Sequence, residues 1–212
     1  MVWSPDSQYI TVLYSSQPLA EVYSIHDLKR VCGITEDGGD IVRYQERATL
    51  WKMAYGHFVL LQIEIEWCPD SKSLITIVEF GLFANVWTVS AEPHICARLV
   101  GPTGRSKGSI QFSEDKSMLA VLTKSQGEDY VVIYSSQGSL DDHIQDNDED
   151  DPPNAPWGII SSFKPCIQKP SSLCWSPDCN RIVVVNDFIK FGFSIHYLDG
   201  SVVNDVRVSF CG

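Results

Sequence analysis

One short phrase occurs four times in this chain of 212 residues and constrains its fold more than any other feature. Each copy begins with an aromatic residue, continues through a short polar stretch that contains Asp, and ends in an aliphatic run. The copies are VWSPDSQYITVL (2–13), EWCPDSKSLITIV (66–78), QFSEDKSMLAVL (111–122) and LCWSPDCNRIVVV (173–185). A phrase repeated in this way marks a catalytic element, a ligand site or a unit of folding.

The spacing of the copies favours a unit of folding. The opening aromatic residues stand 64, 45 and 63 residues apart. The middle interval matches the roughly 40 to 45 residue period of a four-stranded propeller blade, and the other two fit one period plus an insertion. The repeat markers are Trp3, Pro5, Asp6, Trp67, Pro69, Asp70, Phe112, Asp115, Trp175, Pro177 and Asp178. We therefore expect an all-β fold of about three to four four-stranded antiparallel blades.

The same order of strands is expected in each unit. A first strand ends in the motif, a turn and a second strand follow, and a third strand ends near an aromatic residue. Alternation is clear at Leu61, Ile63, Ile65 and Trp67, which is typical of a half-buried antiparallel strand. After the last motif, residues 182–185 are expected to form the second strand. The third strands are expected to end at residues 22–24, 86–88, 132–134 and 195–197.

The Pro-Asp pair has a local explanation. Proline sets φ for the first corner of a turn, and the carboxylate of the next residue can accept hydrogen bonds from backbone N–H groups ahead of it. The preceding tryptophan can pack between sheets while its indole N–H finds an acceptor. We expect Asp6, Asp70 and Asp178 to be turn residues, with no catalytic role.

The charge of the chain is concentrated in one segment. The net charge is −11, and the tract DDHIQDNDEDD (141–151) holds seven carboxylates, so the rest of the chain carries only −4. There is no basic stripe of the kind that binds phosphates, which argues against nucleic acid as the main ligand. The sequence also lacks a long apolar run and a signal peptide, so we expect a cytoplasmic protein that does not act at a membrane.

The cysteines point to the same compartment. There are seven, no two form a C-x-x-C pair, and no N-x-S/T site is present. An odd number without such spacing argues against a secreted disulfide framework. We expect reduced thiols that are mostly buried in the core.

Two segments interrupt the repeat. Residues 38–60 supply about 20 surplus residues and are either a surface excursion with a short helix around 45–54 or the trace of an imperfect gene model. Residues 137–170 contain the acidic tract and DPPNAP, which are typical of a solvated loop, although an acidic docking segment for a basic partner is the alternative. Because binding sites on propellers concentrate on connecting loops, 101–108 and 137–170 are weak candidates for partner contacts.

One motif of catalytic sites occurs, but the neighbouring segments are not the strand and helix that it requires. Gly104-Arg105-Ser106-Lys107-Gly108 matches G-x-S-x-G, which needs a strand before it and a helix after it. Here a strand is expected on both sides, and the order of residues does not fit a phosphate-binding Walker loop. We expect an inter-blade loop in which Arg105 and Lys107 could contact an anion weakly.

The five histidines do not form a metal site. They are scattered, and the pair His94 and Cys96 has no second ligand pair nearby. His143 lies in the acidic tract, which lacks a fixed geometry for selective cation binding. We expect no cofactor, no metal and no catalytic residue.

The motifs resemble those of the WD-repeat β-propeller superfamily. The resemblance is degenerate, because no Gly-His opens a repeat and no Trp-Asp closes one, so the buried Asp-His-Ser-Trp network of regular blades is not assumed. Propellers have 4 to 8 blades, and Trp3 has no strand in front of it. We therefore expect part of a larger propeller of seven or more blades, and the alternative is a strained ring of minimal size.

A narrower resemblance is to the centrosomal and spindle-pole WD-repeat proteins that anchor microtubule minus ends. It is carried by WCPDSKSLITIVEFGLFANVWTV (67–89), SIQFSEDKSMLAVLTKSQGEDYVVIY (109–134) and FIKFGFSIHYLDGS (188–201), with 2–25 fitting the preceding blade. The resemblance implies a non-enzymatic scaffold that joins a coiled-coil adaptor and, in some lineages, a minus-end-directed kinesin at the microtubule-organising centre. The absence of a catalytic constellation independently fits a binding platform.

Two other interpretations remain. One is a WD-repeat translation initiation factor or another generic adaptor, which would co-sediment with small ribosomal subunits in the first case. The other is the propeller of a serine peptidase, in which the catalytic domain is separate. Reaction of Ser106 with a fluorophosphonate probe would favour the enzymatic interpretation.

Overall fold

The computed structural model describes most of the chain and leaves several connections out. The described residues are 1–14, 19–35, 63–78, 83–102, 107–135, 157–186 and 192–207. The expected insertion at 38–60, the acidic tract and Ser106 lie outside these ranges.

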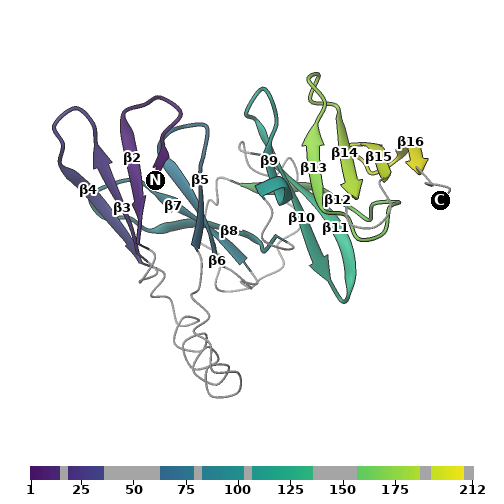
Figure 1. Ribbon diagram of the computed structural model, residues 1–212, viewed down its shortest axis with the longest axis horizontal. Coiled ribbons are helices and arrows are strands. Elements are labelled where there is room, and N and C mark those ends of the chain that lie inside the picture. The colour runs from purple at the N-terminus through teal and green to yellow at the C-terminus, as the bar shows by residue number, and fades with distance from the viewer. Residues whose placement is uncertain are drawn as a thin grey trace, which may run out of the picture. The chain divides into compact units, whose positions relative to one another are not determined.

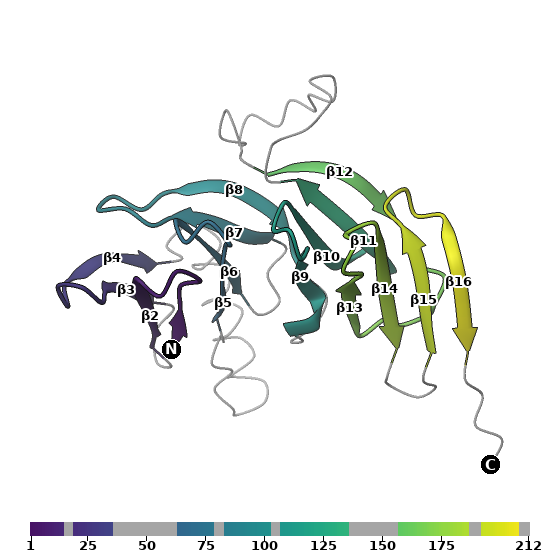
Figure 2. The ribbon, with the colours of Figure 1, turned by 90° about the horizontal axis from the view of Figure 1, so that it is seen from above.

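The described residues form four antiparallel sheets of four strands each (Figure 1). The first two sheets contain β1 (Val2–Trp3), β2 (Tyr9–Leu13), β3 (Leu19–Ser24) and β4 (Arg30–Thr35), then β5 (Ile63–Trp67), β6 (Ser73–Val78), β7 (Phe83–Thr88) and β8 (Ile95–Val100). The third follows a short 3-10 helix, η1 (Lys107–Ser109), and contains β9 (Ile110–Phe112), β10 (Met118–Ser125), β11 (Glu128–Ser135) and β12 (Gly158–Phe163). The fourth contains β13 (Ser172–Trp175), β14 (Arg181–Asn186), β15 (Gly192–Tyr197) and β16 (Val202–Arg207), which lie side by side in chain order (Figure 2). The prediction of an all-β fold of four-stranded blades is confirmed.

The aromatic residue of each motif is the last residue of the first strand in its sheet. Trp3, Trp67, Phe112 and Trp175 end β1, β5, β9 and β13. The expectation that no strand precedes Trp3 is wrong, because Val2 and Trp3 pair with Thr11 and Ile10 as a two-residue strand. The first sheet is therefore complete in strand number.

The expected loop at 137–170 is wrong at its C-terminal end. Residues 158–163 form β12, which pairs with β11 through Ser135↔Gly158 and Val131↔Phe163. The sequence GIISSF shows no clear alternation of apolar and polar residues, so the pattern alone did not indicate a strand, and its structure depends on pairing with β11. The third sheet thereby gains its fourth strand, and the sequence between 135 and 157 connects β11 to β12.

The third and fourth strands share an irregularity in three sheets. The register shifts between Val22 and Tyr23, between Ile133 and Tyr134, and between Ile195 and His196. These shifts stand at corresponding places, near the third-strand ends predicted from the sequence. Because a bulge bends and twists a strand locally, its recurrence indicates that the sheets are structural repeats.

The chain divides into two compact units, of which the first comprises the described parts of 1–79 and 85–95. Its apolar core lies between the first and second sheets, as sheet packing requires. The first sheet contributes Ala20, Val22, Cys32 and Ile34, and the second contributes Ile65, Trp67, Leu74 and Trp87.

The second unit comprises the described parts of 80–84 and 96–212. Its core lies between the third and fourth sheets. The third contributes Ala120, Leu122, Val131, Ile133 and Phe163, and the fourth with its leading loop contributes Ile167, Leu173, Ile182 and Val184.

The cysteines are less buried than the sequence suggested. Within the described ranges only Cys32 and Cys68 are buried, whereas Cys166 and Cys174 are exposed. Cys174 alternates with buried Leu173 on β13 and so lies on the opposite face of its sheet. The prediction of mostly core thiols is therefore wrong for these positions. No helix in the described part of the chain is long and apolar enough to cross a bilayer.

Candidate functional site

The turn after each motif aromatic is held by a serine and an aspartate. In the first sheet, the Ser4 hydroxyl donates to Asp6 Oδ1 (2.6 Å), and the backbone N–H of Gln8 donates to the same oxygen (3.0 Å). The N–H of Tyr9 donates to Ser4 Oγ (2.9 Å). The aspartate accepts a hydrogen bond from a backbone N–H group ahead of it, as the Pro-Asp pair predicts. The serine before the proline makes further hydrogen bonds across the turn, which the sequence interpretation did not assign.

The third and fourth sheets repeat this arrangement. The Ser113 hydroxyl donates to Asp115 Oδ1 (2.6 Å), and the Ser176 hydroxyl donates to Asp178 Oδ1. The backbone N–H groups of Met118 and Arg181 donate to those serines at 2.9 and 3.0 Å. The turn therefore does not require proline, since Glu114 takes its place in the third copy.

The second sheet builds the turn without that serine. Cys68 occupies its position, and the Ser73 hydroxyl instead donates to Asp70 Oδ2 (3.0 Å). The N–H groups of Lys72 and Ser73 both donate to Asp70 Oδ1 (2.8 and 3.0 Å). The aspartate is thus the constant element of all four turns.

The residue after each aspartate has a left-handed backbone. These residues are Ser7 (φ 61°), Ser71 (φ 56°), Lys116 (φ 64°) and Cys179 (φ 57°). Non-glycine residues seldom adopt this conformation, so the bonds to the neighbouring aspartate have to hold it.

The hydrogen bonds stabilise the ionised form of the turn carboxylates. The Ser113 hydroxyl, together with the N–H and hydroxyl of Ser117, lowers the pKa of Asp115 to about 2. The Ser4 hydroxyl lowers the pKa of Asp6, and the Ser176 hydroxyl with Arg181 lowers that of Asp178. These groups are charged near neutral pH and poorly suited to proton transfer.

The third turn should therefore be sensitive to acid. Because the folded state binds a proton at Asp115 less readily than the unfolded state, the stability that this carboxylate contributes is present above about pH 4 and is lost as the pH falls toward about 2. We expect Asp115→Asn to lower stability near neutral pH and to flatten the acid loss in that window. Urea unfolding over a pH series measures this, with Glu114→Gln as the control that leaves the profile unchanged. An Asp115→Asn profile parallel to that of the wild type would contradict it.

The motif tryptophans differ in their surroundings. Trp67 is buried and its ring stacks on that of Tyr9, with centroids 6.0 Å apart and an interplanar angle of 16°. Trp175 donates its indole N–H to the backbone oxygen of Gln111 (2.8 Å). Trp3 is 55% exposed. The predicted role as a packing anchor thus holds for Trp67 and Trp175, each against the preceding sheet of its unit.

Neighbouring turns also touch in the first unit, where the backbone N–H of Asp6 donates to the hydroxyl of Ser71 (3.1 Å). In the second unit, the pKa of Asp115 is lowered mainly by Ser113 and Ser117, with a smaller contribution from Cys179. Ser71 and Cys179 hold equivalent positions, directly after the aspartate of their turns.

The other candidates for chemistry are placed as follows. His94 Nδ1 lies 3.1 Å from the Thr88 hydroxyl, and the described residues contain no group of three or more metal-ligating side chains. His196 is fully buried, with Nε2 2.8 Å from Ser194 Oγ and Nδ1 3.2 Å from the Gly200 oxygen. The indole N–H of Trp87 donates to Thr76 Oγ1 (3.0 Å) within the second sheet.

The strand order of the third sheet places the described parts of the two candidate segments, 101–108 and 137–170. In an antiparallel sheet, the start of β9, the turn from β10 to β11 and the end of β12 share one end. Gly101, in the segment that leads into β9, accepts the Thr123 hydroxyl at this end (2.6 Å). Lys164, just after β12, pairs with Glu128 there (2.6 Å), so parts of both candidate segments stand at one end of this sheet.

In the first sheet, the motif turn is joined to the turn between β3 and β4. The N–H of Ile25 donates to Gln8 O (2.9 Å), and Val89 makes the same bond to Lys72 in the second sheet. Leu28 stands in this second turn with φ 54° and an exposure of 80%. A large apolar side chain is thus held out into solvent by a backbone that leucine disfavours.

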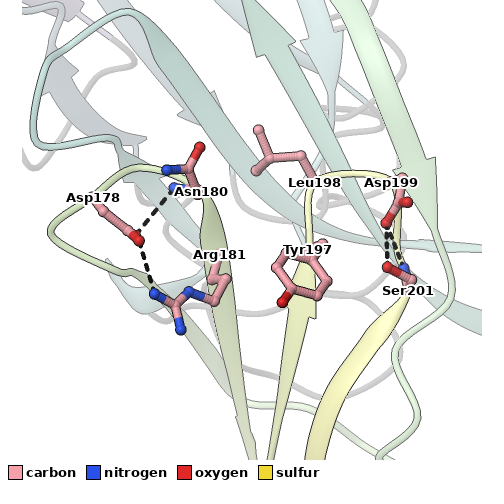
Figure 3. Close-up of a pocket in the computed structure, with 7 residues that line it drawn as sticks. All are labelled: Asp178, Asn180, Arg181, Tyr197, Leu198, Asp199 and Ser201. Atoms are coloured by element: carbon pink, nitrogen blue, oxygen red, sulfur yellow. Dashed lines mark hydrogen bonds and ion pairs between the residues drawn. The ribbon is translucent and has the colours of Figure 1, made fainter.

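The fourth sheet carries an open depression of about 800 Å³ at its turns. Figure 3 shows Asp178 and Arg181 on one side, Asp199 and Ser201 on the other, and Tyr197 between them. Arg181 Nη2 lies 2.8 Å from Asp178 Oδ2, and the Ser201 hydroxyl donates to Asp199 Oδ1 (2.6 Å). Asn180 and Leu198 complete the lining.

Comparison with solved structures shows the same architecture in longer chains. The hydrazine synthase of Kuenenia stuttgartiensis matches with a TM-score of 0.55 and 14% identity, over 97% of this chain and 47% of that one. A putative 6-phosphogluconolactonase from Bacteroides uniformis matches with a TM-score of 0.56 and 14% identity, over 98% and 54%. The periplasmic gluconolactonase of Pseudomonas aeruginosa matches with a TM-score of 0.56 and 13% identity, over 97% and 52%. The four sheets are propeller blades.

One curated protein gives a match in sequence. The WD repeat-containing protein WRAP73 of Mus musculus is 20% identical over 206 residues, which cover 95% of this chain and 35% of that protein. No model of a known protein family matches the chain. The chain is thus distantly similar to a WD-repeat protein, and it spans about a third of that protein's length and about half of each solved propeller.

Proposed function

We propose that this chain is a non-enzymatic propeller scaffold that binds proteins at the centrosome or spindle pole, where it serves microtubule anchoring and spindle organisation. The proposal gives it a coiled-coil adaptor as partner and, in some lineages, a minus-end-directed kinesin, without a cofactor. The spindle-pole assignment is supported by the resemblance of 67–89, 109–134 and 188–201 to the WD-repeat proteins of that structure.

The observation that most supports protein binding is the exposed side chain of Leu28. Its side chain is 80% exposed, and its turn is tied to the motif turn by the bond from Ile25 to Gln8. An exposed apolar side chain on a rigid support loses little conformational entropy on binding, so it suits a protein contact. Asp27 and Lys29 flank it, and such a polar rim is typical of protein interfaces.

The test is the location of the tagged chain in dividing cells. We expect enrichment at the spindle poles for the wild type and loss of enrichment for Leu28→Ala, because the apolar contact is removed while the fold stays intact. Ile159→Ala is the control, since Ile159 is also an exposed apolar residue (53%) but lies in β12. Wild-type protein spread evenly through the mitotic cytoplasm would contradict the proposal.

Two further measurements separate the alternatives. Co-sedimentation with small ribosomal subunits would support an initiation factor instead. The names of the solved neighbours include a synthase and lactonases, but the likeness to them concerns the fold alone. Labelling of Ser106 by a fluorophosphonate probe would overturn the non-enzymatic assignment.

A further inference from the structure

Both units use the same contact between consecutive sheets. In the first unit, Trp67 stacks on Tyr9; in the second, Trp175 packs in the same apolar cluster as Met118. Tyr9 and Met118 each stand six residues after the aromatic of their own motif. The motif tryptophan of one sheet therefore meets an equivalent position of the sheet before it.

One polar contact accompanies this packing in each unit. In the second unit, the Trp175 indole N–H donates to the backbone oxygen of Gln111, the residue before the earlier motif aromatic (2.8 Å). In the first unit, the Trp67 indole N–H has no partner among the described residues, and the backbone N–H of Asp6 donates to the hydroxyl of Ser71, the residue after the later aspartate (3.1 Å). The earlier sheet of each unit thus contacts the later one through the residue six after its motif aromatic and through one polar group beside it.

The fourth sheet has residues at the equivalent positions on an open face. Arg181 stands six residues after Trp175, Cys174 directly precedes Trp175, and Asp178 is the turn aspartate. Cys174 is exposed, and Tyr197, opposite Arg181 in the register, is 47% exposed. Asp178, Arg181 and Tyr197 line the depression in Figure 3.

The apolar residues beside these groups confirm that this is a sheet face without a neighbour among the described residues. Val183 pairs with Cys174 and Ile195 with Val183, and both are only half-buried, whereas Ile182 and Val184 on the opposite face are fully buried. One face of the fourth sheet packs on the third, and the other is left open.

The first sheet carries the complementary group. Trp3 is 55% exposed, whereas Trp67 is only 5% exposed. Ser7, directly after Asp6, is also exposed. On the same sheet, Glu21 accepts the hydroxyls of Tyr14 and Tyr23 (2.7 Å each) and pairs with Arg30 (2.8 Å), so that β3 and β4 are joined by an ion pair.

We propose that the chain self-associates head to tail, with the Trp3 turn of one copy seated in the fourth-sheet depression of a second copy. The indole of Trp3 lies against the Arg181 guanidinium, an arrangement favourable to both groups. Its N–H donates to the Cys174 carbonyl, and Ser7 meets the Asp178 turn. The contact continues the interface already present in each unit.

The second copy is the occupant because it carries the matching turn. Trp3-Ser4-Pro5-Asp6-Ser7 repeats the Trp-x-Pro-Asp-Ser sequence of the second copy of the motif, whose Trp67 and Ser71 make these contacts within the first unit. The two contacting surfaces differ, so the interface is heterologous.

The experiment measures mass against concentration by sedimentation velocity. We expect the wild type to associate, and Trp3→Ala to weaken association about tenfold or more, as removal of a central interface tryptophan does. Ile159→Ala is the matched control, with an exposure of 53% against 55%, and should associate like the wild type. A wild type that stays monomeric, or a Trp3→Ala variant that associates equally well, would overturn the proposal.

Mixing tests the head-to-tail geometry. Trp3→Ala keeps the depression and Arg181→Glu keeps the Trp3 turn, so each should be monomeric alone while the two associate when mixed. Failure of the mixture, with both variants folded by circular dichroism, would reject the geometry.

Thiol reactivity gives a readout that does not depend on Arg181→Glu folding. Maleimide should label Cys174 slowly in the associated wild type and quickly in Trp3→Ala. Cys166, exposed in the connection from β12 to β13, should react equally in both. Equal labelling of Cys174 in the two proteins would also overturn the proposal.

Discussion

Replacing Trp67 by alanine is expected to destabilise the first unit by about 3 to 5 kcal/mol, the usual cost of truncating a large buried aromatic residue. Trp67 is 5% exposed, stacks on Tyr9 and belongs to the core between the first two sheets. Its loss leaves a cavity that both sheets would have to fill. Denaturant unfolding, followed by circular dichroism at low protein concentration, measures the change.

The matched control is the same substitution at the first motif. Trp3→Ala is expected to cost less than about 1 kcal/mol in the isolated chain, because Trp3 is 55% exposed and away from the core. Similar losses at the two positions would show that burial does not distinguish the motif tryptophans.

Replacing Trp67 by phenylalanine refines this expectation. Within the described residues the buried indole N–H of Trp67 has no hydrogen-bond partner. Phenylalanine removes that unsatisfied donor while keeping an aromatic ring, so it should recover most of the stability lost in Trp67→Ala.

The second large effect is expected at Gly200, in the turn between β15 and β16. Its φ is +85°, and a Cβ built there would lie 2.5 Å from Phe163 Cβ. Gly200→Ala therefore combines a left-handed backbone with a clash against the third sheet, at a cost of about 2 to 4 kcal/mol. Thermal or denaturant unfolding of the second unit measures it.

Gly127 separates the two causes. It has the same φ of +85°, in the turn between β10 and β11, but a Cβ there meets nothing within 4 Å. Gly127→Ala should therefore cost only the backbone strain, about 1 kcal/mol. A Gly200→Ala variant no less stable than Gly127→Ala would show that Phe163 moves aside freely.

The turns could be predicted from sequence because their interactions are local. Asp6, Asp70, Asp115 and Asp178 bond to groups two or three residues ahead, so spacing along the chain was enough to find them. The hydrogen bonds of the turn serine are equally local. A serine directly after the aromatic in three of the four copies was a signal that could have revealed them.

Strand β12 shows where local interpretation fails. Its pairing with β11 joins residues on either side of a long connection, and GIISSF has no periodicity that announces it. The prediction that Cys174 is buried was wrong for a related reason. A small thiol on a strand is buried or exposed according to the face that its sheet turns to a neighbour, and that face depends on packing.

The repeat, the turn chemistry and the first three strands of each sheet could be predicted from the sequence, because each rests on contacts a few residues apart. The role of each motif tryptophan depends on tertiary packing instead. Trp67 is buried, Trp175 bonds to Gln111, and Trp3 is exposed, although all three open the same phrase. The difference is physical: Trp67 and Trp175 each contact the sheet before their own, and that sheet comes from a distant part of the chain.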